Sequence, residues 1–285
     1  MHWFIEAAKR GDARAASRLE QIFEHGEGGV PVDLAAAKQW SERRQELEFG
    51  ALVSRAETGQ SLYIEDIKRL ATIYLTGKDP VGDLVIPKDP VKGVYWLRRA
   101  VVIAPDDAEV AASLGQAYSQ GLGVDIDATE AKRWNDKAAA LDPVHFAPVD
   151  QVIAGIDKQP GLTAILLSER LFAANRPDDA VFWYYVGQLR GRMEAASDSD
   201  AAQAYGAIFA TFGPVINEYA AGNVDKLAAT IDRVLAWDAA HPAAHTTSGV
   251  REKERQGLAD LRTYFLKNKD QVRAERAKNG LPNRN

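Results

Sequence analysis

A tryptophan that recurs at a nearly fixed distance is the feature that most constrains this 285-residue chain. Trp3 and Trp40 are 37 residues apart, Trp96 and Trp134 are 38 apart, and the interval between the two pairs is 56 residues. A period of this length is typical of solenoids whose unit is a pair of helices, because one pair cannot bury its apolar face alone. The spacing therefore predicts stacked helical pairs in the first half of the chain.

A fixed order of residues precedes each of the three later tryptophans. A leucine and an aromatic residue four positions later share one helix face and can fill the space between paired helices. The glycine that follows is suited to end the first helix in a left-handed conformation, and the aspartate before the second helix can accept its free backbone N–H groups. These positions are Leu19, Phe23, Gly26 and Asp33; Leu70, Tyr74, Gly77 and Asp89; and Leu114, Tyr118, Gly121 and Asp127.

The combined pattern resembles the Sel1-like repeat, a relative of the tetratricopeptide repeat, and the match is strongest over Leu114–Ala139. The resemblance implies a right-handed α-solenoid of helix-turn-helix repeats over residues 1–142. It also implies a protein that binds another protein and catalyses no reaction.

Two departures from the repeat carry further expectations. The unit from Trp40 to Trp96 is about 18 residues longer than the others. Part of the excess lies between Gly77 and Asp89, and the rest predicts an extended second helix after Trp40. The chain also opens with Trp3, so we expect it to start within a repeat and the natural protein to have more N-terminal sequence.

After Asp142 the repeat pattern stops, and residues 143–285 are predicted to form an all-helical C-terminal domain. No segment alternates with period two, so we expect little or no sheet. A break is expected at Gly213–Pro214, because proline lacks the backbone N–H that a helix needs. The predicted helices cover residues 162–174, 178–196, 201–211, 215–221, 224–239 and 250–277.

Composition and motifs limit the chemistry. The absence of cysteine excludes disulfides and cysteine-based zinc sites, and a net charge of −5 argues against nucleic acid as a partner. No apolar run approaches the ~20 residues that a membrane span requires. His241 and His245 have metal-ligand spacing, but Pro242 lies between them and makes a continuous helix there unlikely to form. We expect no metal and no cofactor, and the sequence leaves the oligomeric state undetermined.

The partner-binding candidates come from helical phase. In a solenoid the first helix of each pair usually lines the binding surface. The non-core positions of these helices are Arg69, Thr72 and Ile73 in the second unit and Ser113, Gln116 and Gln120 in the third.

The second half adds four candidates. Four consecutive aromatic residues, Phe182–Tyr185, predict a helix buried on most sides, and Trp183 and Tyr184 are alternatively the rings of a partner groove. Asn217 and Tyr219 follow the Gly213–Pro214 break, where they make either a local capping network or partner contacts.

This half is similar to domains found near secreted bacterial lipase toxins. The residues that carry the similarity are Val186–Arg190, Gly213–Pro214, Asn217–Tyr219, Asp232 and Trp237–Asp238. The similarity implies an immunity protein that binds and occludes a type VI, lipase-type toxin. The bacterial periplasm or envelope is the favoured location, with the cytoplasm as the alternative. An envelope assembly scaffold or adaptor is the nearest competing function. The alternative from another class is a hydrolase with its site between the two halves.

Overall fold

The computed structural model describes residues 1–59, 63–243 and 246–284. Within these ranges the chain is helical, and its one strand-like feature is an isolated antiparallel bridge between Lys78 and Val85. None of the described helices is both long enough and apolar enough to cross a membrane. The prediction of an all-α fold is therefore confirmed. The chain divides into two compact units, residues 1–141 and 142–285, called here unit 1 and unit 2.

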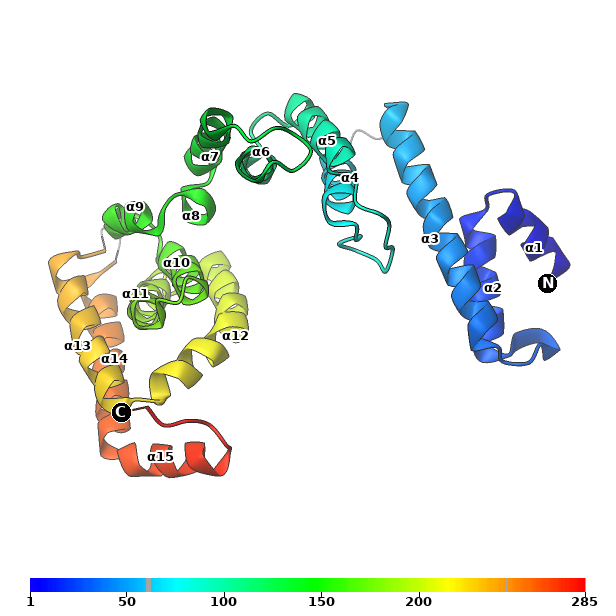
Figure 1. Ribbon diagram of the computed structural model, residues 1–285. Helices are drawn as coiled ribbons and strands as arrows, with labels where there is room; N and C mark the ends of the chain where they lie inside the picture. The colour runs from blue at the N-terminus through cyan, green and yellow to red at the C-terminus, as the bar shows by residue number, and fades with distance from the viewer. Residues whose placement is uncertain (60–62, 244–245, 285) are drawn as a thin grey trace. The chain divides into compact units, whose positions relative to one another are not determined.

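Unit 1 is a series of helical hairpins, each of which pairs a first helix with the helix that follows it (Figure 1). A short helix, α1 (His2–Lys9), precedes the first hairpin and packs on α2. The hairpins are α2 (Ala13–His25) with α3 (Leu34–Glu57), α4 (Ile64–Thr76) with α5 (Pro90–Ile103), and α6 (Ala108–Gln120) with α7 (Ala128–Leu141). A 3-10 turn, η1 (Glu27–Gly29), lies between α2 and α3.

The predicted caps form where the repeat pattern places them. The glycines that end α2, α4 and α6 are left-handed, with φ of 72°, 76° and 71°. The aspartates before α3, α5 and α7 each accept at least one backbone N–H of the helix that follows, which satisfies donors that have no partner inside the helix. The glycines are Gly26, Gly77 and Gly121, and the aspartates are Asp33, Asp89 and Asp127.

The extended second helix expected after Trp40 is α3, and it serves two cores. Its N-terminal half contributes Trp40 and Leu47 to a cluster around Leu19 of α2. Its C-terminal half contributes Leu52 and Ala56 to the larger core of α4–α7. One continuous helix therefore joins the first hairpin to the other two.

Successive hairpins approach most closely at Gly123, in the turn after α6. Its φ is +72°, and a Cβ built there would lie 2.1 Å from the backbone oxygen of Pro90, at the start of α5. Only a residue without a side chain fits this approach, because backbone on both sides leaves no flexible group to move away.

Gly123→Ala is expected to destabilise unit 1 by about 3 kcal/mol or more, since it adds a backbone clash to the cost of about 1–2 kcal/mol of a left-handed non-glycine residue. Gly28→Ala is the matched control, because Gly28 also has positive φ but nothing lies within 4 Å of its Cβ position. Urea unfolding followed by circular dichroism measures both. Equal losses for the two variants would show that the close approach to Pro90 is unimportant.

Unit 2 is built around α11 (Pro177–Ala195), which packs against α10 (Gly161–Ala173), α12 (Ser199–Ala221), α13 (Val224–Ala240) and α14 (Ser248–Lys267). Every residue from Ala180 to Gly187 is buried, so the prediction that the aromatic run marks a helix buried on most sides is confirmed. The remaining elements are α8 (Pro143–Phe146), α9 (Val149–Ala154), η2 (Ile156–Lys158) and α15 (Lys269–Lys278).

The predicted break at Gly213–Pro214 is wrong, because α12 runs continuously through both residues. Proline removes one backbone hydrogen bond, to the carbonyl of Ala210, but both Ala210 and Pro214 are exposed, and water can satisfy that carbonyl. The ribbon of α12 bends instead of ending (Figure 1).

The single helix predicted over residues 250–277 is also wrong. The structure has two helices, α14 and α15, which meet at Asn268. The Asn268 side-chain amide donates to the backbone oxygen of Tyr264 at 2.8 Å, a local bond that competes with helix continuation.

Candidate interaction surface

The first helices of the second and third hairpins carry the predicted partner residues of unit 1, and all but one of these residues are accessible. Gln116 and Gln120 of α6 are exposed, while Ser113 of the same helix and Arg69 and Thr72 of α4 are half-buried. These positions alternate with the buried residues that form the core, as helical phase requires.

Ile73 is the exception among these candidates, because its side chain is fully buried. The buried positions of α4 include Leu70 and Tyr74 as well as Ile73, so the core covers a wider arc of this helix than a narrow stripe would. Ile73 is therefore a core residue and is not available to a partner.

A lysine between α4 and α6 fixes their spacing. The Lys68 ammonium lies 3.2 Å from a carboxylate oxygen of Asp107 and 2.5 Å from one of Glu109. Burial works to lower the pKa of Lys68, but its hydrogen bonds to Glu109 and Asp107 outweigh burial and raise it. Because Lys68 precedes Arg69 and the two acids precede Ser113, this bridge sets how the accessible faces of the two helices are spaced.

Two of the predicted partner residues already have partners within the chain. The Arg69 guanidinium donates to both carboxylate oxygens of Asp79, at 2.9 and 2.5 Å, and the Thr72 hydroxyl donates to the backbone oxygen of Lys68 at 3.0 Å. In the part of unit 1 that the structure describes, the side chains of Ser113, Gln116 and Gln120 make no hydrogen bond to the rest of the chain. The α6 face is thus the freer of the two.

The Arg69–Asp79 pair also anchors the loop of residues 78–89, which is the insertion noted between Gly77 and Asp89. The Asp79 side chain is only 4% exposed, and the hydrogen bonds from Arg69 lower the pKa of its carboxyl group. Asp79 also accepts the backbone N–H of Val81 at 3.1 Å, so the same carboxylate shapes the tip of the loop.

This anchored loop forms one wall of a groove that the sequence analysis missed. The groove has a volume of about 540 Å³ and is open to solvent along α3. Its walls come from the start of α2, from residues 44–55 of α3, from Arg69 of α4 and from residues 79–84 of the loop. The only signal in the sequence was the excess length of the second unit.

Asp79→Asn is expected to lower the free energy of unfolding by about 1–2 kcal/mol at pH 7, because the charged pair with Arg69 is lost. The folded-state pKa of Asp79 is lowered. Its stabilisation is therefore full above the unfolded-state value of about 3.9 and disappears as the pH falls through the folded-state value. Urea unfolding at pH 7 and pH 3 should show a difference between wild type and variant that shrinks at pH 3.

The control for Asp79 is Asp136→Asn, which removes an exposed pair with Lys132 and should cost less than 1 kcal/mol. A difference for Asp79→Asn that is the same at both pH values would contradict the role given to its charge.

In unit 2, two of the four predicted partner residues belong to the core. Trp183 is 6% exposed and its ring meets that of Trp237 edge-on at 5.4 Å between centroids. Tyr184 is fully buried, its hydroxyl accepts a hydrogen bond from Gln188 at 2.8 Å, and burial raises its pKa. Both residues are therefore placed to stabilise the domain, not to contact a partner.

The other two predicted residues tie α12 to α11. Asn217 is exposed, and its side-chain oxygen accepts a hydrogen bond from the Tyr185 hydroxyl at 3.1 Å. The Tyr219 hydroxyl donates to Asp178 at 3.2 Å, and the Arg284 guanidinium lies over the Tyr219 ring. These bonds are tertiary contacts between helices rather than a local cap.

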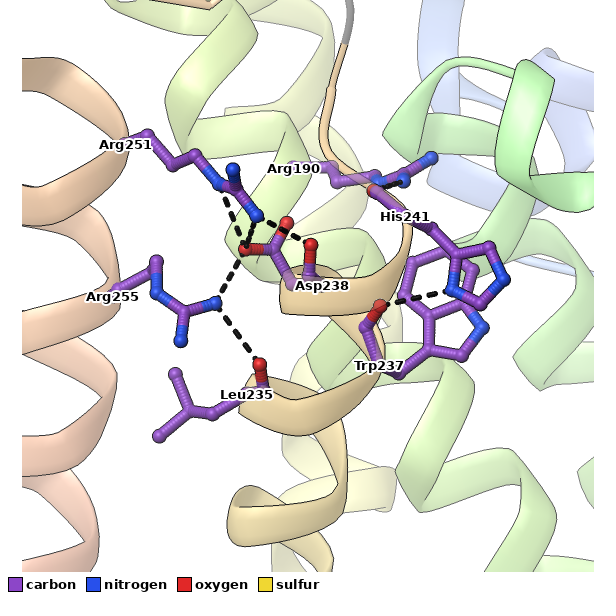
Figure 2. A network of polar contacts seen from close by, with 7 residues as sticks. All are labelled: Arg190, Leu235, Trp237, Asp238, His241, Arg251 and Arg255. Carbon is purple, nitrogen blue, oxygen red and sulfur yellow. Dashed lines mark hydrogen bonds and ion pairs between the residues drawn. The ribbon is translucent and has the colours of Figure 1, made fainter. Parts of the chain in front are cut away.

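A buried carboxylate holds α13 against α14 (Figure 2). Asp238 is 1% exposed, and one of its carboxylate oxygens lies 3.1 Å from Arg251 and 2.6 Å from Arg255. The same two arginines also donate to backbone oxygens, Arg251 to Asp238 and Arg255 to Leu235. The carboxylate thus sits between two cations that are themselves fixed to the end of α13.

A second buried charge lies beside this cluster (Figure 2). The Arg190 guanidinium lies over the Trp237 ring at 4.4 Å and donates to the backbone oxygens of His241 and Asp157 at 2.5 and 2.8 Å. Burial lowers the pKa of Arg190. Arg190, Trp237 and Asp238, three of the residues that suggested the toxin-linked similarity, therefore lie in one cluster of the domain.

Of the two histidines with metal-ligand spacing, only His241 lies in the described part of the chain. The His241 ring is hydrogen-bonded through Nδ1 to the backbone oxygen of Trp237 at 2.9 Å, and His245 lies outside the described residues. Among the residues that the structure does describe, no group of three or more His, Asp or Glu side chains is placed to hold a metal ion.

Asp238→Asn is expected to cost about 3 kcal/mol or more of unfolding free energy, since it leaves two arginines beside an uncharged group. Asp232→Asn on the same helix removes a more exposed pair with Arg262 and should cost less than 1 kcal/mol. Thermal unfolding of both variants compares the two sites, and a similar shift in Tm for each would refute the special role of Asp238.

Comparisons with known proteins identify the repeats. The Sel1 repeat model matches residues 1–12, 13–43, 67–101 and 108–143. The unmatched residues 44–66 include the extended part of α3 and the connection to α4. Each matched segment from residue 13 onward covers one helical hairpin or most of one.

The chain is also similar to a curated protein and to solved structures of repeat proteins. The chain is 27% identical over 136 residues to chitin synthase regulatory factor 3 of Schizosaccharomyces pombe, a match that spans 48% of this chain and only 12% of that protein. A Sel1 repeat protein from Oxalobacter formigenes is 24% identical, with 49% of this chain and 89% of that chain covered and a TM-score of 0.25. A protective antigen of uropathogenic Escherichia coli with an SLR fold is 18% identical, with coverages of 75% and 41% and a TM-score of 0.23.

Proposed function

Residues 1–43, 67–101 and 108–143 match the Sel1 repeat, and from this premise we propose that the protein acts by binding another protein, without turnover. Sel1 repeat proteins are generally adaptors for protein–protein interaction, and the repeat is typically a non-catalytic scaffold. The observation that carries the proposal is the α6 face. Ser113, Gln116 and Gln120 are accessible there and have no hydrogen bonds within the described chain.

The name of the curated relative supports the same class of function. It names a regulatory factor of the enzyme chitin synthase. The chain covers a small part of that relative, so only this general class of function is taken from it.

The finer proposal concerns the partner. We take it to be a secreted bacterial toxin of the lipase type, delivered by a type VI system, which the protein occludes as an immunity protein in the periplasm or envelope. The basis is the similarity of residues 143–285 to toxin-linked domains, and we propose that these residues form a domain separate from residues 1–142. Val186, Leu189, Arg190 and Asp238 are buried in unit 2, so these residues of the similarity support a shared fold. Pro214, Asn217 and Glu218 are exposed and are therefore accessible to a partner.

The carboxyl groups with shifted pKa values do not point to acid–base catalysis. Hydrogen bonds to cations lower the pKa of Asp79 and Asp178. For Glu20, burial works to raise the pKa, but the hydrogen bonds from Arg44 and Ser41 and the charge of Arg44 together lower it. A general acid at neutral pH needs a raised pKa. These three shifts instead report ion pairs that hold the fold.

A pull-down with the tagged protein from native lysate, read by mass spectrometry, tests the proposal. One stoichiometric partner with lipase activity, inhibited on adding the purified protein, is the expected result. Several envelope-assembly proteins would favour the scaffold, and hydrolysis by the protein itself would refute non-catalytic binding.

The surface is tested with Gln116→Arg and Gln120→Arg combined, which should weaken capture of the partner at least tenfold because two bulky charges replace polar contacts. The control carries the same change at the exposed residues Gln203 and Gln271 of unit 2. Unchanged capture by the α6 variant would show that this face is not the contact.

A further inference from the structure

Two exposed arginines in the groove beside α3 make no polar contact that holds the described parts of the chain together. Arg14 of α2 and Arg55 of α3 both line the groove, and both are exposed. Neither side chain makes an ion pair or hydrogen bond within the described parts of the chain. In this respect they differ from the other two arginines of the groove, Arg44 and Arg69.

The paired arginines neutralise most of the acidic groups in the walls. Arg44 lies 2.9 Å from a carboxylate oxygen of Glu20 and 3.2 Å from one of Glu48, and its pKa is raised by the hydrogen bond to Glu20. Arg69 neutralises Asp79 in the same way. The groove lining holds four arginines and three carboxylates, those of Glu48, Asp79 and Asp83, so the lining by itself carries one surplus positive charge. Arg44 is shared between Glu48 and Glu20, and Glu20 lies outside the lining.

The loop adds an apolar contact surface next to these charges. Val81 at the tip of the loop is 78% exposed, and the half-buried Phe49 of α3 lies in the same groove. Leu84 is 8% exposed and packs the loop against the unit, while the Arg69–Asp79 pair anchors it. An exposed apolar residue on an anchored loop can contact a partner without the loop having to become ordered on binding.

We propose that this groove binds an extended, acidic segment of the partner protein. Two carboxylates of the segment pair with Arg14 and Arg55, because guanidinium groups bind carboxylates through two parallel hydrogen bonds. An apolar side chain of the segment packs against Val81 and Phe49. This inference rests on the proposed function, because it describes the chemistry of a protein partner.

The composition of the groove favours an acidic peptide over nucleic acid. Nucleic-acid surfaces are basic over a wide area, whereas this groove keeps Glu48, Asp79 and Asp83 in its walls and the whole chain has a net charge of −5. A peptide with spaced carboxylates places its charges only where the free arginines are, and so avoids the acidic walls.

The test uses the full chain and two fluorescein-labelled peptides, one with the tripeptide Glu-Asp-Leu repeated four times and one with Gln-Asn-Leu repeated four times. Fluorescence anisotropy at 50 mM NaCl should give a Kd for the acidic peptide at least tenfold lower than for the neutral one. The preference should diminish at 300 mM NaCl, because salt screens exposed charges.

Arg14→Gln combined with Arg55→Gln should raise the Kd for the acidic peptide at least tenfold, and the corresponding lysine variants should restore part of the affinity. Arg43→Gln is the matched control, since Arg43 lies on α3, outside the groove lining, and pairs with Glu46 at 3.0 Å. Its Kd should stay within twofold of wild type. Circular dichroism checks that each variant is folded, as expected because Arg14 and Arg55 are exposed and Arg43 makes only a local pair on the helix surface.

Three results would overturn the proposal: equal affinity for the two peptides, equal effects of the groove variant and Arg43→Gln, or tighter binding of a single-stranded oligonucleotide than of the acidic peptide. The outcome is separable from that of the proposed function. If the variant with both Arg14 and Arg55 changed still captures a stoichiometric partner, the groove is not the binding site, but the proposal that the protein binds another protein still holds.

Discussion

Unit 1 depends on close packing between successive hairpins, since no single pair of helices here buries enough apolar surface to be stable alone. Besides the apolar core that α4–α7 share, the approach of Gly123 to the Pro90 carbonyl and the bridge from Lys68 to Asp107 and Glu109 join the second and third hairpins. The first is possible only without a side chain, and the second holds the exposed faces of α4 and α6 at a fixed spacing. The accessible surface of the repeats is thus a product of the contacts between them.

The parts of the fold that depend on neighbouring residues could be predicted from the sequence. Gly26, Gly77 and Gly121 end their helices, and the capping aspartates begin the next ones, because these interactions span only a few residues. The same reasoning from neighbouring residues gave a wrong prediction at Pro214, where a helix break was expected and α12 continues. Whether a proline ends a helix depends on whether water reaches the freed carbonyl, and exposure is a property of the whole domain.

The candidate site shows the same limit. Helical phase correctly placed Gln116 and Gln120 on the surface, but it could not tell that the core covers Ile73. The groove was invisible in the sequence because it depends on pairings such as Arg44 with Glu20 and Arg69 with Asp79, which are distant along the chain. Arg14 and Arg55 stand out only once the partners of the other arginines are known.

The continuous helix α3 gives unit 1 a property that a regular repeat array lacks. In such an array each hairpin is a separate structural unit, and its stability is coupled to that of its neighbours only through the interface between them. Here Trp40 and Leu52 belong to different cores but to the same helix, so unfolding of the whole of α3 removes residues from both cores. A change that destabilises α3 at the first hairpin therefore also affects the core of the second and third hairpins, because both cores contain residues of this helix.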